Sequence, residues 1–106
     1  MIIDETFHQE YRLGNYDLTR VHHSDGHVLR VRVHRDFYGF QSYALVEVFT
    51  PARTWTVLAT TPWTDWHDAS PMQATDATPL TPVADRLIER ARRILSAATS
   101  TPSAKG

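Results

Sequence analysis

The sequence predicts an α+β domain, in which an antiparallel meander of about five strands packs on one C-terminal helix. Two observations lead to this fold class. Short segments of alternating polar and apolar residues, separated by turn residues, fill roughly the first 60 positions. An apolar spacing of three and four residues, typical of an amphipathic helix, begins only after Thr81-Pro82. The chain has 106 residues, which is enough to bury one hydrophobic core.

The first strand is expected over Thr6 to Leu13, and Gly14-Asn15 then supplies a two-residue turn that can reach positive φ. Pairing across this turn sets two cross-strand pairs, Arg12 opposite Asp17 and Tyr11 opposite Leu18. A short helix is the alternative for this segment, because Thr6-x-x-Gln9 resembles a capping box.

The next three strands form the centre of the predicted sheet. Tyr16 to His23 and His27 to Arg35 flank an Asp25-Gly26 turn, and Gln41 to Thr50 follows as the fourth strand. A second turn at Tyr38-Gly39 gives these cross-strand pairs: Val33 with Ala44, Val31 with Val46, Leu29 with Val48, and Arg30 with Glu47. Because a slip of one residue moves every side chain to the other face, the agreement among these pairs supports the register.

The fifth strand is expected over Thr54 to Thr60, with Trp55, Val57 and Ala59 on the core side. Residues 61–80 contain three prolines and no sustained period, so we expect a long loop of the kind that is functional or flexible in compact domains. The helix begins with Thr81 as its N-cap. Residues 1–98 are therefore expected to form one domain, and residues 99–106 a disordered tail.

The predicted register gives the sheet two different faces. The first is apolar and seats the helix, with Tyr11, Leu18, Leu29, Val31, Val33, Ala44, Val46, Val48, Trp55 and Val57. The second face carries Arg30, Arg32, His34, Tyr43, Leu45, Glu47, Phe49 and Leu58. A solvent face of an antiparallel sheet is normally mostly polar, and one helix does not cover two faces. We therefore expect something to cover part of the second face.

Three kinds of cover are considered. The first is intramolecular, by the Trp63–Trp66 loop or by an N-terminal segment with Ile2, Ile3 and Phe7. The second is another protein or a second copy of the chain, since Tyr, Phe and Arg are favoured at interfaces. The third is single-stranded nucleic acid.

In the nucleic-acid interpretation, Tyr43 and Phe49 stack on bases while arginines hold phosphates. The arginines are Arg30 and Arg32 on the sheet, and Arg86, Arg90 and Arg93 along one helix face. A net charge of −1 does not favour a polyanionic partner, and a helical stripe of arginines is more often a solvated face.

Histidines gather at the Asp-Gly hairpin, where His22, His23 and His27 suggest a metal site. Adjacent residues of a strand point to opposite faces, however, so His22 and His23 do not easily serve one ion. The chain contains no cysteine to complete a thiolate site, and no glycine-rich phosphate loop. We expect no metal and no cofactor.

The segment His67-Asp68 with Ser70 contains the residue types of a hydrolytic triad. It has neither the glycine-flanked serine motif nor an oxyanion-hole motif, and all three residues fall in one irregular loop. We therefore expect no enzyme and no catalytic residues. A small hydrolase that uses His67 and Asp68 is the alternative.

The first residues have neither a basic region nor a long apolar run, and no window is apolar enough to span a membrane. We expect a cytoplasmic protein without membrane contact.

Residues 31–44, Val-Arg-Val-His-Arg-Asp-Phe-Tyr-Gly-Phe-Gln-Ser-Tyr-Ala, and residues 55–59, Trp-Thr-Val-Leu-Ala, resemble small proteins of actinobacteria and their phages. In that group a similar Arg-Asp-x-Tyr-x-Phe-Gln-Ser-Tyr-Ala core precedes a C-terminal helix like Val83 to Leu95, and the resemblance covers about residues 28–96. The group has no assigned activity, so the resemblance implies no catalytic residues. It implies an origin in a phage or mobile element, where small domains often bind host or phage proteins.

The leading hypothesis from the sequence is a non-enzymatic protein-interaction domain that self-associates through the second face. The candidate interaction residues are Arg30, Arg32, His34, Tyr43, Leu45, Phe49, Leu58, Trp63 and Trp66.

Overall fold

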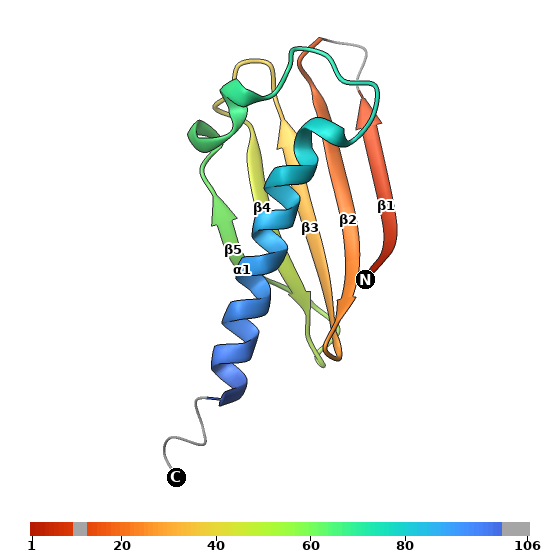
Figure 1. Ribbon diagram of the computed structural model, residues 1–106, viewed down its shortest axis with the longest axis vertical. Helices are drawn as coiled ribbons and strands as arrows, with labels where there is room; N and C mark the ends of the chain where they lie inside the picture. The colour runs from red at the N-terminus through yellow and green to blue at the C-terminus, as the bar shows by residue number, and fades with distance from the viewer. Residues whose placement is uncertain (10–12, 101–106) are drawn as a thin grey trace.

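A computed structural model describes residues 1–9 and 13–100 of the chain, with side chains up to residue 98. Its strands are β1 (Ile2–Gln9), β2 (Tyr16–Ser24), β3 (His27–Arg35), β4 (Tyr43–Phe49) and β5 (Trp55–Thr61). They form one antiparallel sheet in the order β1-β2-β3-β4-β5. The helix α1 (Thr81–Ser100) runs along one face of this sheet (Figure 1). The predicted α+β meander with one C-terminal helix is confirmed.

Three short 3₁₀ helices connect β5 to α1: η1 (Trp63–Asp65), η2 (His67–Ala69) and η3 (Thr78–Leu80). The segment that the sequence predicts as a long loop is therefore partly ordered into single turns. In the described part of the chain, no helix has both the length and the apolar character needed to span a membrane.

The two central hairpins have the predicted register. Across β3 and β4, Val31 pairs with Val46 and Arg30 pairs with Glu47. The Asp25-Gly26 turn connects β2 to β3 with both residues at positive φ, 50° and 82°. This is the conformation that a tight antiparallel hairpin requires, which explains why the turn fixes the register of the strands beside it.

The predicted register of the first hairpin is wrong. β1 begins at Ile2 and pairs Phe7 with Leu18 and His8 with Asp17, the residues for which the sequence predicted Tyr11 and Arg12 as partners. Tyr11 and Arg12 lie outside the described residues. Since β1 is a strand, the alternative of an N-terminal helix is also wrong.

The turn residues of this hairpin have another role, which explains the error. The Asn15 side chain donates to the Asp36 carboxylate at 3.2 Å and accepts from the Phe37 backbone N–H at 3.0 Å. Gly14 has φ of 88°, and a Cβ on it would lie 2.9 Å from the Phe37 ring. Gly14 and Asn15 therefore dock the β1–β2 connection against the residues that follow β3.

A β-bulge in β5 changes which side chains face the helix. Val46 pairs with Ala59 but the next residue, Glu47, pairs with Val57, so Leu58 is the extra residue. Leu58 consequently packs against the helix-side core, while Val57 lies on the opposite face with Glu47 and is 49% exposed. The predictions that Trp55 and Val57 face the core and that Leu58 lies on the second face are wrong. The prediction for Ala59, which is buried, is confirmed.

The hydrophobic core lies between the sheet and α1. The fully buried residues of the sheet include Leu18, Leu29, Val31 and Val46, and α1 contributes Val83, Ala84, Leu87, Ile88 and Ala91. Trp66 is 2% exposed in the same core, and Trp63 packs against it. The tryptophan loop therefore covers the helix side of the sheet and not its second face.

Arg20 joins three elements at the β1 edge. Its guanidinium bonds to Glu5 on β1 at 2.8 Å and to Asp85 on α1 at 3.1 Å, and it donates to the Thr81 hydroxyl. Arg20 is 5% exposed, so these partners satisfy a cation that would otherwise be costly to bury.

Candidate functional site

The sheet face opposite α1 is uncovered in the described part of the chain. Figure 1 shows α1 and the β5–α1 connection on one side of the sheet only. We call the other side the open face and define it by Asp17, Thr19, Val21, Arg30, Arg32, His34, Tyr43, Leu45, Glu47, Phe49, Trp55 and Val57. Tyr43, Phe49 and Val57 are 39%, 41% and 49% exposed.

An ion pair shielded by an aromatic ring occupies one part of the open face. Arg30 donates to both carboxylate oxygens of Glu47, at 2.9 and 3.3 Å. The guanidinium carbon of Arg30 lies 4.2 Å from the centroid of the Trp55 ring, within cation–π range. Glu47 is only 7% exposed, and the Phe49 ring lies 5.1 Å from that of Trp55. This part of the face is therefore electrically neutral and partly apolar.

A second aromatic group lies toward the other end of the same strands. The ring of His34 stacks on that of Tyr43, with centroids 5.4 Å apart and an interplanar angle of 27°. The Arg32 guanidinium lies 6.0 Å from the Tyr43 ring, and Asp17 lies 3.7 Å from His34. Arg32 has no carboxylate within ion-pairing distance among the described residues. Arg32 is therefore available to pair with an acidic group of a ligand.

The structure places six of the predicted interaction residues together on the open face: Arg30, Arg32, His34, Tyr43, Leu45 and Phe49. The other three, Leu58, Trp63 and Trp66, pack on the helix side, as described above. Sequence reasoning missed Trp55 and Val57, because their place on the open face depends on the bulge at Leu58. The unbroken alternation of residues 55–59 contains no signal of that bulge.

The arginines of the nucleic-acid interpretation lie on two different layers. Arg86, Arg90 and Arg93 are exposed on α1, which lies behind the sheet as seen from the open face. Arg90 also donates to the Thr60 carbonyl oxygen at 2.8 Å. One strand of nucleic acid lying on Tyr43 and Phe49 would not reach these arginines without passing around an edge of the sheet.

The residues of the suggested hydrolytic loop make structural hydrogen bonds. The Nε2 atom of His67 donates to the Asp36 carbonyl oxygen at 2.8 Å, which leaves Nδ1 facing Asp68 at 3.4 Å. The hydroxyl of Ser70 donates to the Trp66 carbonyl oxygen at 3.2 Å. In the described part of the chain, no hydrogen bond joins the Ser70 hydroxyl to the His67 ring, so these two side chains form no nucleophile–base pair.

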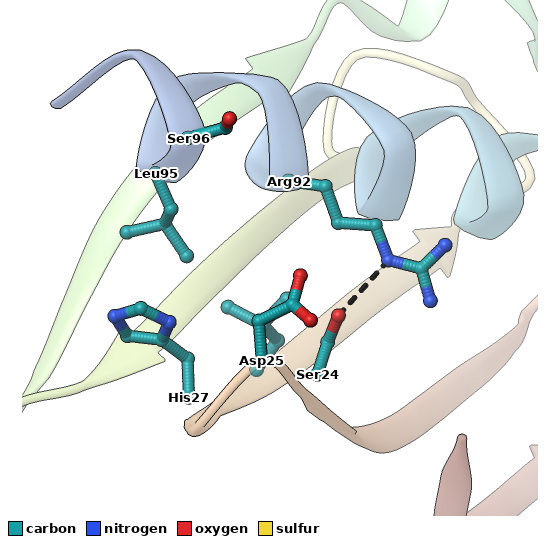
Figure 2. A pocket seen from close by; sticks show the side chains of 7 residues that line it. Ser24, Asp25, His27, Arg92, Leu95 and Ser96 are labelled. Carbon is teal, nitrogen blue, oxygen red and sulfur yellow. Dashed lines mark hydrogen bonds between the residues drawn. The ribbon is translucent and has the colours of Figure 1, made fainter. Parts of the chain in front are cut away.

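A hollow of about 320 Å³ lies between the β2–β3 hairpin and the last turns of α1 (Figure 2). Leu29 and Leu95 supply apolar lining, and Arg92 at its side donates to the Ser24 hydroxyl at 3.1 Å. His27, which pairs with Ser24 across the hairpin, also lines the hollow. The same part of the chain contains no group of three or more His, Asp or Glu side chains placed to hold a metal ion.

Comparisons with protein-family models, with curated proteins and with solved structures give no match to this chain. Its function is therefore inferred from the open face itself.

Proposed function

We propose that this chain is a non-enzymatic protein-interaction domain that binds its partner through the open face. The observation that carries the proposal is the partial exposure of Tyr43, Phe49 and Val57 on a sheet whose other face packs against α1 and the β5–α1 connection. Large apolar patches with a polar surround are uncommon on monomers unless they bind something.

The composition of the open face supports a protein partner more than a nucleic acid. Tyr, Trp and Arg are the side chains that dominate binding energy at protein interfaces. The Tyr43 ring is stacked with His34, and the Trp55 ring is covered by Arg30, so intramolecular contacts already occupy ring faces that bases would need. Glu47 neutralises Arg30, which leaves little positive charge for phosphates.

The charge of the open face also specifies the partner's chemistry. Arg32 lies beside Leu45 and Tyr43, and no carboxylate of the described residues pairs with it. A partner that places an Asp or Glu against Arg32 and an apolar side chain against Leu45, Phe49 and Val57 would satisfy both features. The ion pair between this carboxylate and Arg32 would lose its water on binding. A partner without a carboxylate at that position would leave Arg32 unpaired, so the position of the carboxylate gives specificity.

Site-specific photo-cross-linking tests this proposal. A benzophenone amino acid replaces Tyr43 or Phe49 on the open face, and Glu89 on the exposed side of α1 serves as the matched control. After irradiation in a host lysate, we expect a discrete protein adduct from the two open-face positions and none from the control. The adduct is then identified by mass spectrometry, and the cross-link is repeated with Arg32→Glu, which should reduce its yield about tenfold or more.

Three outcomes would contradict the proposal. Adducts that form equally from the Glu89 position, or yields that Arg32→Glu leaves unchanged, would show that the open face does not select the partner. Binding of a labelled single-stranded oligonucleotide, weakened by Tyr43→Ala and by salt, would establish the nucleic-acid alternative instead.

A further inference from the structure

The two edges of the sheet differ in how they are protected. At the β5 edge, the bulge at Leu58 interrupts the ladder and Arg90 bonds to the Thr60 carbonyl oxygen. These are devices that prevent an edge strand from pairing with another chain. At the β1 edge, no side chain in the described part of the chain bonds to the backbone of Ile2–Gln9. β1 therefore presents a row of main-chain donors and acceptors.

We propose that a second copy of this chain pairs with β1, antiparallel and centred on Thr6, so that two sheets become one. From Asp4 to Gln9 the pairing of β1 with β2 is regular, and the shift in register lies before Asp4. This regular stretch is long enough for an intermolecular ladder. Asp4, Thr6 and His8 share the open-face side of β1, since they pair with Val21, Thr19 and Asp17 on β2.

The charges along β1 select one register. Residues that lie opposite each other in a continuous sheet point to the same face. The two-fold axis between the two β1 strands must therefore lie between the two copies of one residue, so that this residue is opposite itself. An axis at Thr6 sets Asp4 opposite His8 of the partner subunit, and this pair occurs twice. An axis at Glu5 would set two carboxylates against each other, and an axis at Phe7 leaves no oppositely charged pair. Cross-strand pairs of opposite charge stabilise a sheet, whereas like charges destabilise it.

A second copy fits the open face less well than the β1 edge. A two-fold axis that stacks two open faces over the centre of the sheet lays β3 against the partner's β3. Arg30 and Arg32 would then approach the arginines of the other copy, and Arg32 has no neutralising carboxylate among the described residues. Like charges brought together at an interface cost several kcal/mol. The self-association expected from the sequence is therefore assigned to β1.

Charge exchange at the two paired positions tests the inference. The dissociation constant is measured by sedimentation velocity over a concentration series at about pH 6, because a histidine forms an ion pair with a carboxylate only in its imidazolium form. Asp4→Lys and His8→Glu should each raise the constant about tenfold, because the two-fold axis applies each change twice. The double variant Asp4→Lys/His8→Glu recreates opposite charges and should restore the wild-type constant to within about threefold.

Matched controls make the test specific. Asp68→Lys and His27→Glu introduce the same charge changes outside β1 and its neighbour β2, and should leave the constant unchanged. Asp4, His8 and Asp68 are exposed and His27 is partly exposed, so the variants are expected to fold, which circular dichroism verifies. A wild-type chain that is monomeric at every concentration overturns the inference. A dimer whose double variant shows the combined loss of affinity of the two single variants, with no recovery, also overturns it. Neither result affects the cross-links from β4, so the proposed function is tested separately.

Discussion

The buried imidazole of His22 shows how one residue sets the response of this domain to acid. His22 is 6% exposed, and its Nε2 atom has no hydrogen-bond partner among the described residues. Burial, together with the positive charges of Arg20, the N-terminus and Arg92, lowers the pKa of His22 to about 4 against an opposing effect of Asp85. The folded state therefore holds His22 neutral at a pH where the unfolded chain already binds a proton.

The free energy of unfolding should consequently fall as the pH is lowered from about 6.5 to about 4, and this loss should level off below that range. The sign follows from the lowered pKa, because the unfolded state binds more protons throughout this window. The expected loss is on the order of 3 kcal/mol. His22→Leu should flatten the dependence without loss of stability at neutral pH, as followed by urea denaturation at several pH values.

The neighbouring histidine provides the control. His23 is exposed on the opposite face of β2, so His23→Gln should keep the wild-type pH dependence. An equal flattening in both variants would place the acid sensitivity elsewhere, for example in the carboxylates of Glu5 and Asp85 that bind Arg20.

Residue-level pairing was predictable wherever two short turns fixed the register. The Arg30–Glu47 pair follows from that register, and the structure forms it with two hydrogen bonds. The cation–π contact of Arg30 with Trp55 was not predictable, because it requires the bulge in β5. The burial of Trp66 was equally out of reach, since an irregular connection contains no period from which its direction can be inferred.

At the scale of elements, the β3–β4 turn and the β5–α1 connection hold each other in place. Gly39 in that turn is buried with φ of 92°, and a Cβ on it would lie 2.9 Å from the Trp63 ring. Trp63 in turn packs against the core, so the ring has little freedom to move away. The sequence identified Tyr38-Gly39 as a turn but gave no indication that Trp63 lies against it.

Two glycine substitutions separate the contact from the backbone strain. Gly26 has φ of 82° but nothing within 4 Å of a Cβ, so Gly26→Ala pays only for left-handed geometry, about 1 kcal/mol. Gly39→Ala adds the clash with Trp63 and should cost about 1–3 kcal/mol more. Chemical denaturation of both variants gives the difference. Equal losses would mean that the connection is not packed against the turn.

Elements were predicted best where the chain supplied its own local constraint. The Asp25-Gly26 turn specifies the β2–β3 hairpin, and α1 begins at Thr81 as Thr81-Pro82 indicated. The prediction that Thr81 is the N-cap is wrong, because Thr81 is itself helical, with φ of −57° and ψ of −44°, and its hydroxyl donates to the Ala77 carbonyl oxygen. β1 lies nearer the N-terminus than the predicted strand, which was expected over Thr6 to Leu13. Its last residue, Gln9, pairs with Tyr16, so the β1–β2 connection is longer than the two-residue turn that Gly14-Asn15 suggested. The longer connection depends on the hydrogen bonds of Asn15 to Asp36 and Phe37, which join segments far apart in the sequence.

At the scale of the whole molecule, pairing through β1 would determine how the open faces are presented. A two-fold axis between antiparallel β1 strands runs perpendicular to the sheet. Both α1 helices then lie on one side of the joined sheet, and both open faces lie on the other. The dimer would offer two partner sites facing the same way, which raises the apparent affinity for a partner that carries repeated binding segments.

Footprinting of the whole chain at low and high protein concentration distinguishes this arrangement from stacked open faces. Dimerisation through β1 should slow backbone amide exchange between Asp4 and His8, because an unpaired edge becomes hydrogen-bonded. Oxidation of Tyr43 and Phe49 by hydroxyl radicals should stay constant, since both remain exposed on the open face. Stacking would reverse the pattern, with Tyr43 and Phe49 protected and the β1 amides unchanged. Asp4→Lys should abolish the concentration dependence of β1 exchange, and the double exchange with His8→Glu should restore it.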